Sequence, residues 1–377
     1  MSTIEPVTVS YASLVSQDAA LPSQIRSAFD SSPSSLGLLI VKDLPTEFAQ
    51  LRKRLLLLSN AFASLDEATR EKYTHEASSY SFGWSHGKEI MNGEPDRLKG
   101  SFYNNPTSDE TPGLNAGDAP TKNIWPNEKG VEGYEEAFKA LCKLMVDVGG
   151  LVAAACDQLV GDSGTASSKT VEELLRQSQA SKARLLHYFP RPNSVFSLPP
   201  STSLPENPPK ETVDDSWCGT HIDHSLLTVL CPSMYLFHPE TTQGDAPADP
   251  LIIPSPSKST GLFIKTRSGE VVQATIPENC LALQTGETLE LLTSKRLAAT
   301  PHFVNATASC LGRRALEAIE AKKEADETWK GVERGTVTRE TLAVFLQPNN
   351  DEVVSPDGET FGQFTARVFK RHYVEAK

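Results

Sequence analysis

The segment Gly219–Leu230, GTHIDHSLLTVL, places two histidines and an aspartate at the start of an apolar run. Residues i and i+2 of a strand point to the same face, so a strand here would present His221 and Asp223 side by side. Burying such groups is costly unless they are paired or bind a ligand. An imidazole together with a carboxylate suits Fe(II), manganese or zinc. The segment therefore predicts a metal site, with His224 on the opposite face of the strand.

A third metal ligand is expected further along the chain. His302 lies in the short apolar segment AATPHFV, after several predicted strands that can return the chain beside the first pair. Two histidines and one carboxylate form the facial triad of non-haem iron oxygenases, which leaves coordination positions open. We predict that His221, Asp223 and His302 bind one metal ion.

The segment RETLAVFLQP carries a second pattern of alternating residues. Arg339 and Thr341 would share one face of a strand, and a guanidinium with a hydroxyl can clamp a terminal carboxylate. A diacid such as 2-oxoglutarate needs this clamp at its far end. Ala343 and Phe345 continue along the same face, so we expect both to line a substrate pocket. Phe345 would form an apolar wall, and Ala343 would leave space beside it.

Hydrophobic periodicity divides the chain into two parts. Residues 1–182 are rich in helical patterns, including long ones at 46–73 and 134–161. Residues 183–377 consist mostly of short apolar runs separated by turns, which is typical of strands. Two proline-rich stretches, 190–215 and 238–260, are predicted loops, and a charged helical insertion is expected near 313–330. The fold class is α+β, with a helix-rich N-terminal region and a β-rich core that carries long loops.

The order of these motifs resembles the isopenicillin N synthase-like family of 2-oxoglutarate/Fe(II)-dependent dioxygenases. The similar segments are GLLIVKDLP, DRLKGSFYNNP, ARLLHYFP, THIDHSLLTVL and RETLAVFLQP. The resemblance implies a double-stranded β-helix (jelly-roll) core and the use of Fe(II), 2-oxoglutarate and O2. In this family 2-oxoglutarate loses carbon dioxide to give succinate.

The resemblance also implies roles for further residues. Tyr188 would help to bind 2-oxoglutarate, because Phe189 stands where the family has a tyrosine. Either Tyr188 compensates or the cosubstrate has one hydrogen bond fewer. Tyr103 and His224 are further candidates for the substrate pocket.

The apolar pocket predicts oxidation of an aliphatic C–H bond in a small molecule. A looser similarity to fungal amino-acid oxygenases suggests an L-amino acid such as valine, with C–N closure to an aziridine in secondary metabolism. Hydroxylation or desaturation of another metabolite remains an alternative, as does a sensor that binds iron and 2-oxoglutarate without turnover. A zinc hydrolase would leave the predicted carboxylate clamp unexplained.

Composition narrows the choice of partners. The 377 residues carry a net charge of −12, which argues against nucleic acid or an anionic membrane surface. The sequence contains no apolar run of roughly 20 residues and no visible secretory signal. The six cysteines are scattered, as expected of reduced thiols. We expect a cytoplasmic protein with a small-molecule substrate, and the oligomeric state stays open.

Overall fold

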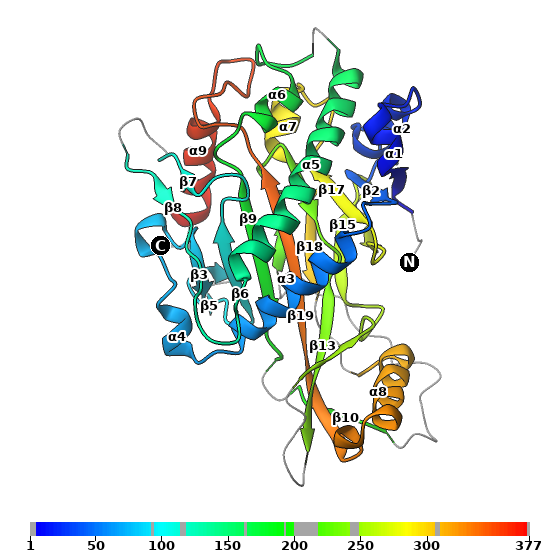
Figure 1. Cartoon of the computed structure of the whole chain (residues 1–377). Coiled ribbons are helices and arrows are strands. Elements are labelled where there is room, and N and C mark those ends of the chain that lie inside the picture. The colour runs from blue at the N-terminus through cyan, green and yellow to red at the C-terminus, as the bar shows by residue number, and fades with distance from the viewer. Residues whose placement is uncertain are drawn as a thin grey trace.

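The computed structural model describes residues 5–91, 94–113, 118–161, 164–191, 194–199, 218–241, 249–305 and 310–374. Within these ranges the chain forms one large sheet, one smaller sheet and helices that cover the large sheet (Figure 1). This arrangement confirms the predicted α+β class.

The large sheet has eight strands along its main path, all antiparallel to their neighbours except for the parallel pair β1 and β2. Three further strands, β10, β13 and β14, extend it beside β19. Strands from the helix-rich N-terminal region thus join the same sheet as strands from the second half. In spatial order the main path runs through β1 (Val7–Ser10), β2 (Leu38–Lys42), β17 (Leu281–Thr285), β12 (Leu227–Leu230), β19 (Val332–Leu346), β9 (Lys182–Tyr188), β6 (Lys99–Asn104) and β3 (Gly83–His86).

The outer face of this sheet packs on helices. Alternate residues such as Val229, Leu342 and Val344 are fully buried and join the core that α3 and α5 cover. Helix α5 approaches β19 closely at Gly149, where a Cβ atom would lie 2.2 Å from Cδ1 of Leu346. The helices are α1 (Tyr11–Ser16), α2 (Leu21–Phe29), α3 (Phe48–Ala63), α4 (Glu67–Glu71), α5 (Tyr134–Val160), α6 (Val171–Arg176), α7 (Glu287–Leu292), α8 (Arg313–Ala325) and α9 (Phe361–Val374).

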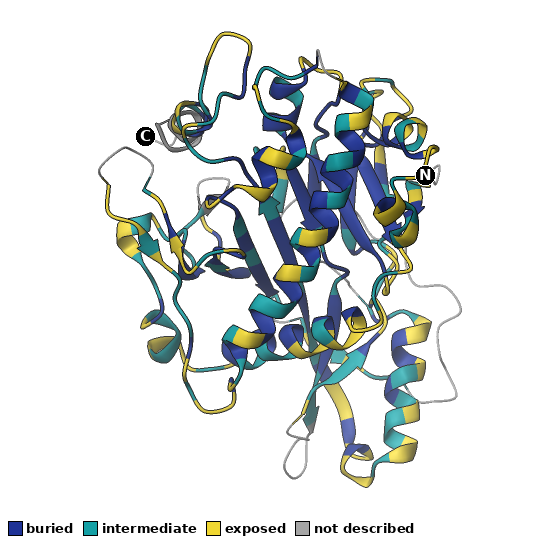
Figure 2. Ribbon diagram, turned by 45° about the horizontal axis from the view of Figure 1, so that its top comes forward, coloured by how far each residue is buried: buried dark blue, intermediate teal, exposed yellow. Residues whose placement is uncertain are grey.

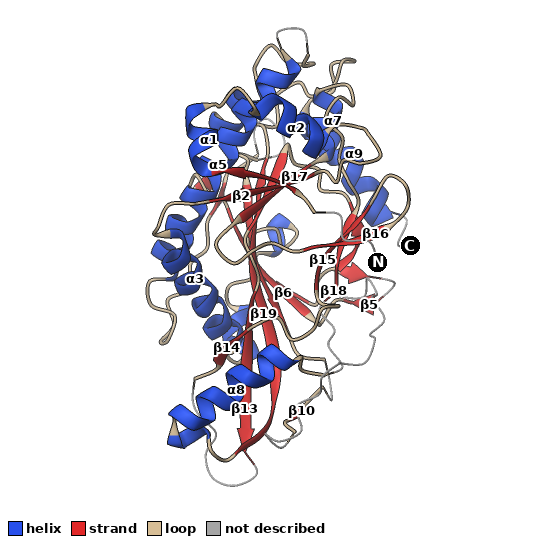
Figure 3. Ribbon diagram, turned by 90° about the vertical axis from the view of Figure 1, so that its right-hand side faces the viewer, coloured by secondary structure: helices blue, strands red, loops and turns tan. Residues whose placement is uncertain are grey.

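The smaller sheet lies on the opposite, inner side of the large sheet (Figure 3). Its strands, in spatial order, are β11 (Cys218–His221), β18 (His302–Asn305), β15 (Gly261–Lys265) and β16 (Val271–Ala274). An apolar cluster joins the two sheets, with Leu38 and Ala282 from the large sheet and Leu262 and Ile264 from the small one. The inner face of the large sheet is therefore enclosed between the two sheets.

The predicted elements agree with the structure in outline and differ in detail. The long helical pattern at 46–73 is broken into α3 and α4, and the pattern at 134–161 is the continuous helix α5. The prediction of a loop throughout 238–260 was wrong, because β13 (Met234–Thr241) enters this stretch and β14 (Leu251–Ile253) pairs with it. Of the other predicted loop, residues 192–193 and 200–215 lie outside the described residues, and β10 (Phe196–Ser197) forms between these two stretches.

The predicted insertion near 313–330 contains α8 and the short 3-10 helix η3 (Glu327–Trp329). Its apolar residues Leu316, Ile319 and Trp329 pack on Phe237 of β13 and Val332 of β19. Figure 2 shows that the other faces of α8 are exposed or partly exposed. The insertion thus covers the far end of the extended β13–β19 pair, away from the enclosed inner face.

Four shorter strands form two hairpin-like pairs outside these sheets: β4 (Ile90–Met91) with β5 (Glu94–Pro95), and β7 (Glu110–Thr111) with β8 (Thr121–Lys122). One further 3-10 turn, η1 (Glu76–Ser78), precedes β3. Within the described part of the chain, none of the helices combines the length and the apolar character needed to cross a membrane.

Candidate metal centre

The two predicted histidine ligands face each other across neighbouring strands of the small sheet. His221 ends β11 and is paired directly with His302, the first residue of β18. Their ring centroids are 4.4 Å apart. In each ring Nδ1 lies near a backbone carbonyl oxygen, that of Gly219 at 2.7 Å and that of Thr300 at 3.3 Å. Because a carbonyl only accepts, Nδ1 donates and Nε2 is left with its lone pair for a metal.

Asp223 reaches the same point by a different route from the one predicted. Strand β11 ends at His221, so Asp223 lies in the connection to β12 rather than two residues along the same strand. The hydroxyl of Thr228 on β12 donates to Oδ2 of Asp223 at 2.7 Å and holds the carboxylate in place. The carboxylate then lies 3.4 Å from Nε2 of His221 and 3.8 Å from Nε2 of His302.

The three predicted ligands therefore converge. Their ligand atoms all lie within 4.8 Å of one another, and among the residues that the structure describes no other trio of histidine, cysteine, aspartate and glutamate side chains does so. Burial raises the pKa of the Asp223 carboxyl, but the nearby His302 and the hydrogen bonds from His221 and Thr228 bring it well below its usual value. Burial lowers the pKa of His302. Burial also lowers the pKa of His221, but the neighbouring Cys218 and Asp223 raise it well above its usual value. An ionised carboxylate and a neutral imidazole are the forms that bind a metal, so metal binding here would displace a proton from His221.

Arg339 occupies the inner face of β19, as the alternation predicted. It is paired with Tyr188 of β9 and Tyr235 of β13, and its guanidinium lies 4.6 Å from the centroid of the Tyr188 ring. The residue is 6% exposed, and neither Nε nor Nη1 has a hydrogen-bond partner among the described residues. A buried cation with free donors is a ready binding point for a carboxylate.

Thr341 shares this face, but its hydroxyl already has a partner. Its Oγ1 donates to the backbone carbonyl of Cys231 at 2.9 Å. In this arrangement the hydroxyl proton is not directed at a ligand, so the donors available for a carboxylate come from Arg339.

The structure decides which of two adjacent aromatic residues lies beside Arg339. Tyr188 is buried on the inner face, where it stacks on the guanidinium. Phe189 packs instead against His86 and His187, with ring centroids 4.7 and 4.3 Å apart. Of the two aromatic residues, Tyr188 is therefore the one that lies beside the Arg339 guanidinium.

Ala343 and Phe345 also lie on the inner face of β19, as predicted. They share an apolar cluster with Leu186 and Tyr188 of β9. Val304, two residues beyond His302 on β18, packs against the same cluster. The inner face of β19 therefore continues from Arg339 through Ala343 and Phe345 toward the predicted metal ligands.

The other two pocket candidates have different surroundings. Tyr103 lies on β6 opposite Arg184, and its hydroxyl donates to Oε1 of Glu89 at 3.0 Å. The ring of His224 lies near Phe361 and Phe364 of α9, with centroids 6.4 and 6.1 Å apart. These contacts place His224 against the C-terminal helix, and nothing among them places it beside the inner-face cluster of Ala343 and Phe345.

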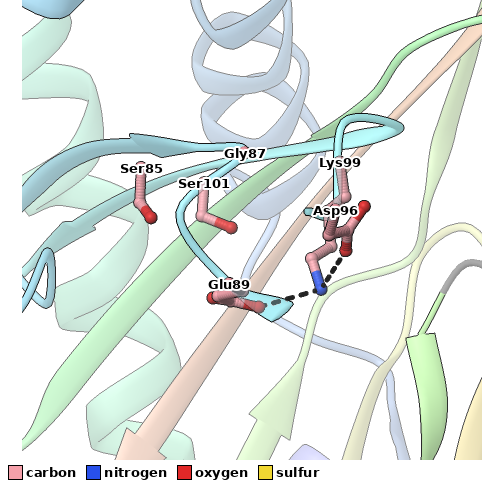
Figure 4. A pocket seen from close by; sticks show the side chains of 6 residues that line it. All are labelled: Ser85, Gly87, Glu89, Asp96, Lys99 and Ser101. Carbon is pink, nitrogen blue, oxygen red and sulfur yellow. Dashed lines mark ion pairs between the residues drawn. The ribbon is translucent and has the colours of Figure 1, made fainter. Parts of the chain in front are cut away.

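Sequence reasoning missed a charged cluster on the inner face. Lys99 lies between Asp96 and Glu89, with ion pairs of 3.1 and 3.3 Å, and Arg184 pairs with Glu89 at 2.6 Å. Figure 4 shows Lys99, Asp96 and Glu89 gathered around a small hollow with Ser101 on its wall. Burial raises the pKa of Glu89, but Arg184 and Lys99 bring it well below its usual value. The signal was present, since Lys99, Ser101 and Tyr103 alternate along β6.

No model of a known protein family matches the sequence, and no curated protein matches it closely. Solved structures do share the fold. A putative 2OG-Fe(II) oxygenase family protein from Caulobacter crescentus is 19% identical, with a TM-score of 0.60 over 97% of this chain and 99% of that one. A putative oxygenase from Shewanella oneidensis is 13% identical, with a TM-score of 0.58 over 97% and 98%.

A third structure, JOX2 in complex with 2OG, Fe and JA, is 13% identical, with a TM-score of 0.57 over 97% of this chain and 84% of that one. At such low identity these similarities establish the fold alone, and the chemistry has to be argued from the residues of the site. The chain therefore has the fold of the 2OG-Fe(II) oxygenases.

Proposed function

We propose that this protein is a 2-oxoglutarate/Fe(II)-dependent oxygenase of the isopenicillin N synthase-like type, and that its two facing sheets form the double-stranded β-helix of that group. The observation that carries the proposal is the placement of two incomplete sites in one enclosure. One is the His221, Asp223 and His302 trio. The other is the buried guanidinium of Arg339, two of whose nitrogen atoms have no hydrogen-bond partner in the described part of the chain. A metal completes the first, and the distal carboxylate of 2-oxoglutarate completes the second.

The residues present fit both groups. Two Nε2 atoms and a carboxylate supply a facial set of donors and leave positions for a cosubstrate and oxygen. A bound Fe(II) ion would supply the oxygen chemistry, with conversion of 2-oxoglutarate to succinate and carbon dioxide. Thr228 orients the Asp223 carboxylate, and the two backbone carbonyls fix the imidazole tautomers. Tyr188 packs against the guanidinium that would bind the cosubstrate.

The apolar cluster on the inner face supports an aliphatic substrate. Ala343, Phe345 and Leu186 present an apolar wall beside the site, with no acid or base among them. Such a wall excludes water and orients a C–H bond, which is the part left to the protein when the bound groups carry the chemistry. Within this class we propose a small molecule such as L-valine as substrate, with C–N closure to an aziridine in fungal secondary metabolism. Hydroxylation or desaturation is the alternative outcome.

The test is release of succinate that depends on both Fe(II) and 2-oxoglutarate. We expect the His302→Ala protein to lose its bound metal, because the two remaining ligands, His221 and Asp223, would hold the ion weakly. Succinate release should then fall to the background level. His75→Ala, which removes a histidine next to η1 and outside the trio, is the matched control and should keep full metal content and activity. Full activity of the His302→Ala protein would rule out the proposed metal site.

A further inference from the structure

The inner face of the large sheet carries four basic side chains on three neighbouring strands. Directly opposed residues of antiparallel strands project to the same face, and the register links Lys99 to Tyr188, Arg184 to Ala343 and Lys182 to Phe345. Arg339 is the fourth. A buried or partly buried cation is stable only when an anion or a set of acceptors faces it, so each of the four needs a partner.

Two of the four are neutralised by the protein itself. Lys99 has two carboxylates within 3.3 Å, those of Asp96 and Glu89. Arg184 pairs with Glu89 at 2.6 Å, donates to Ser101 at 2.9 Å and lies 4.9 Å from the centroid of the Tyr103 ring. These two cations are therefore satisfied without a ligand.

The other two are not. Arg339 is the carboxylate site already described. Lys182 is partly buried, and among the described residues no carboxylate lies within ion-pair distance of its ammonium group. The ammonium group lies instead over the ring of Phe82, 5.9 Å from its centroid. Burial lowers the pKa of Lys182, and no neighbouring charge opposes this effect.

The two unneutralised cations are too far apart for one small diacid. Lys182 is paired with Phe345, which lies six positions beyond Arg339 on β19. Lys182 and Arg339 are therefore about 20 Å apart along the strand direction. Across the sheet, Phe345 is in turn paired with Thr228, the residue that holds Asp223, and we call this line of directly paired residues the Lys182 row. Lys182 is thus about 10 Å from Thr228, two strand spacings away, and a small molecule would span that distance to the metal trio.

A second unpartnered group lies on the same row. Gln284 of β17 is paired with Thr228 and is 1% exposed, yet neither its amide nitrogen nor its amide oxygen has a hydrogen-bond partner among the described residues. An orphaned buried amide is costly unless a ligand or water satisfies it. The Lys182 row thus runs from Lys182 through Phe345 and Thr228 to Gln284. The two residues at its ends, Lys182 and Gln284, both carry polar groups without a partner among the described residues.

We propose that Lys182 binds the carboxylate of the primary substrate, and that the substrate class is small aliphatic carboxylates, amino acids included. The enclosure then receives two anionic ligands for its two unneutralised cations: the cosubstrate at Arg339 and the substrate at Lys182. Phe345 lies between Lys182 and the metal trio, so the aliphatic part of the substrate packs against it. This inference rests on the proposed function for the identity of the ligand at Arg339.

The experiment compares a carboxylate with its neutral amide. Protein saturated with Mn(II) and 2-oxoglutarate is titrated by calorimetry with 3-methylbutanoate, 3-methylbutanamide and L-valine. We expect the parent to bind 3-methylbutanoate at least tenfold more tightly than the amide, because a charge-assisted contact is lost in the amide. Lys182→Met should abolish this preference, and Lys182→Arg should retain most of it. Lys143→Met, which removes an exposed lysine of α5, should behave as the parent does.

The affinity for 2-oxoglutarate should be unchanged in Lys182→Met, which shows that the variant is folded. Equal affinity of the parent for the acid and the amide, no binding of either acid, or an unchanged preference in Lys182→Met would each overturn the inference. The proposed function fails separately, by the absence of 2-oxoglutarate binding and of succinate release. A preference for carboxylates that depends on Lys182, measured without cosubstrate, would survive that failure.

Discussion

At the scale of single residues, the candidate site combines an unsatisfied cation with a converging set of possible metal ligands. Arg339 is buried with two nitrogen atoms that have no hydrogen-bond partner among the described residues, and two imidazole Nε2 atoms converge on one carboxylate. A stable fold ordinarily satisfies buried charged groups internally, as it does for Arg184 and Lys99 on the same sheet face. On one sheet face, Lys99 and Arg184 are satisfied by carboxylates of the protein and Arg339 is not. We use this contrast to distinguish structural cations from cations proposed to bind a ligand.

Replacing Arg339 tests the cosubstrate assignment. Arg339→Met removes the cation and both free donors, and loss of one partner of a desolvated charge pair costs about 2–5 kcal/mol. We therefore expect the KM for 2-oxoglutarate to rise by at least about tenfold while the affinity for the metal stays as in the parent. Arg339→Lys should fall between the two, because a lysine keeps the charge but not the fork geometry. An unchanged KM for 2-oxoglutarate in Arg339→Met would contradict the assignment.

At the scale of elements, β19 carries the site on one face and a buried polar network on the other. Glu340, between Arg339 and Thr341, is completely buried beneath α3. It accepts hydrogen bonds from His187 at 2.6 Å and Ser59 at 2.9 Å, and from Asn60 of α3 at 3.1 Å. This network joins β19 to β9 and α3, and so fixes the register that points Arg339 inward.

Removing the centre of this network should destabilise the whole fold. Glu340→Ala leaves several buried donors without an acceptor, and breaking a buried charged network costs about 3–5 kcal/mol. Urea unfolding should show this loss, with a smaller loss for Glu340→Gln because its amide oxygen still accepts. Glu317→Ala, in an exposed ion pair on α8, should change the free energy of unfolding by less than about 1 kcal/mol. Equal stability of Glu340→Ala and the parent would refute a structural role for the network.

At the scale of the whole molecule, two sheets enclose the site and the helices lie outside it (Figure 3). The proposed metal ligands come from the small sheet and from the connection to β12, whereas the proposed carboxylate site belongs to β19 and β9 of the large sheet. Ligands bound at these two places would therefore link the two sheets. Because such ligands bind the folded state, they would add to its stability by mass action.

Stepwise addition of ligands should reveal this coupling in the melting temperature. A ligand at about 100 times its Kd adds about 2.7 kcal/mol to stability, so Mn(II) followed by 2-oxoglutarate should raise the Tm in two separate steps. His302→Ala should lose the metal step, and Arg339→Met should keep the metal step but lose the step for 2-oxoglutarate. If Arg339→Met retained both steps, the diacid would have to bind elsewhere.

The sequence by itself determined the inward side of β19 and the long helix α5, because both depend on local periodicity. It named the three residues of the candidate metal trio by their types, although the strand geometry assumed for Asp223 was wrong. Residues two apart on a strand share a face in any fold, so Arg339, Thr341, Ala343 and Phe345 could be grouped without coordinates. Helix α5 could be placed for the same reason, since its apolar residues recur at helical spacing.

Only the tertiary structure decided which of these groups remain available for ligands. Asp223 lies beyond the end of its strand and is held by a hydroxyl from β12, and the Thr341 hydroxyl is bonded to a carbonyl that is distant in sequence. Lys99 and Arg184 reach carboxylates in the segment that precedes β6, whereas no carboxylate of the described residues lies within ion-pair distance of Lys182. Periodicity gives the face on which a side chain lies, but its partners come from strands brought together by folding, and these partners determine whether a charge is satisfied or free to bind.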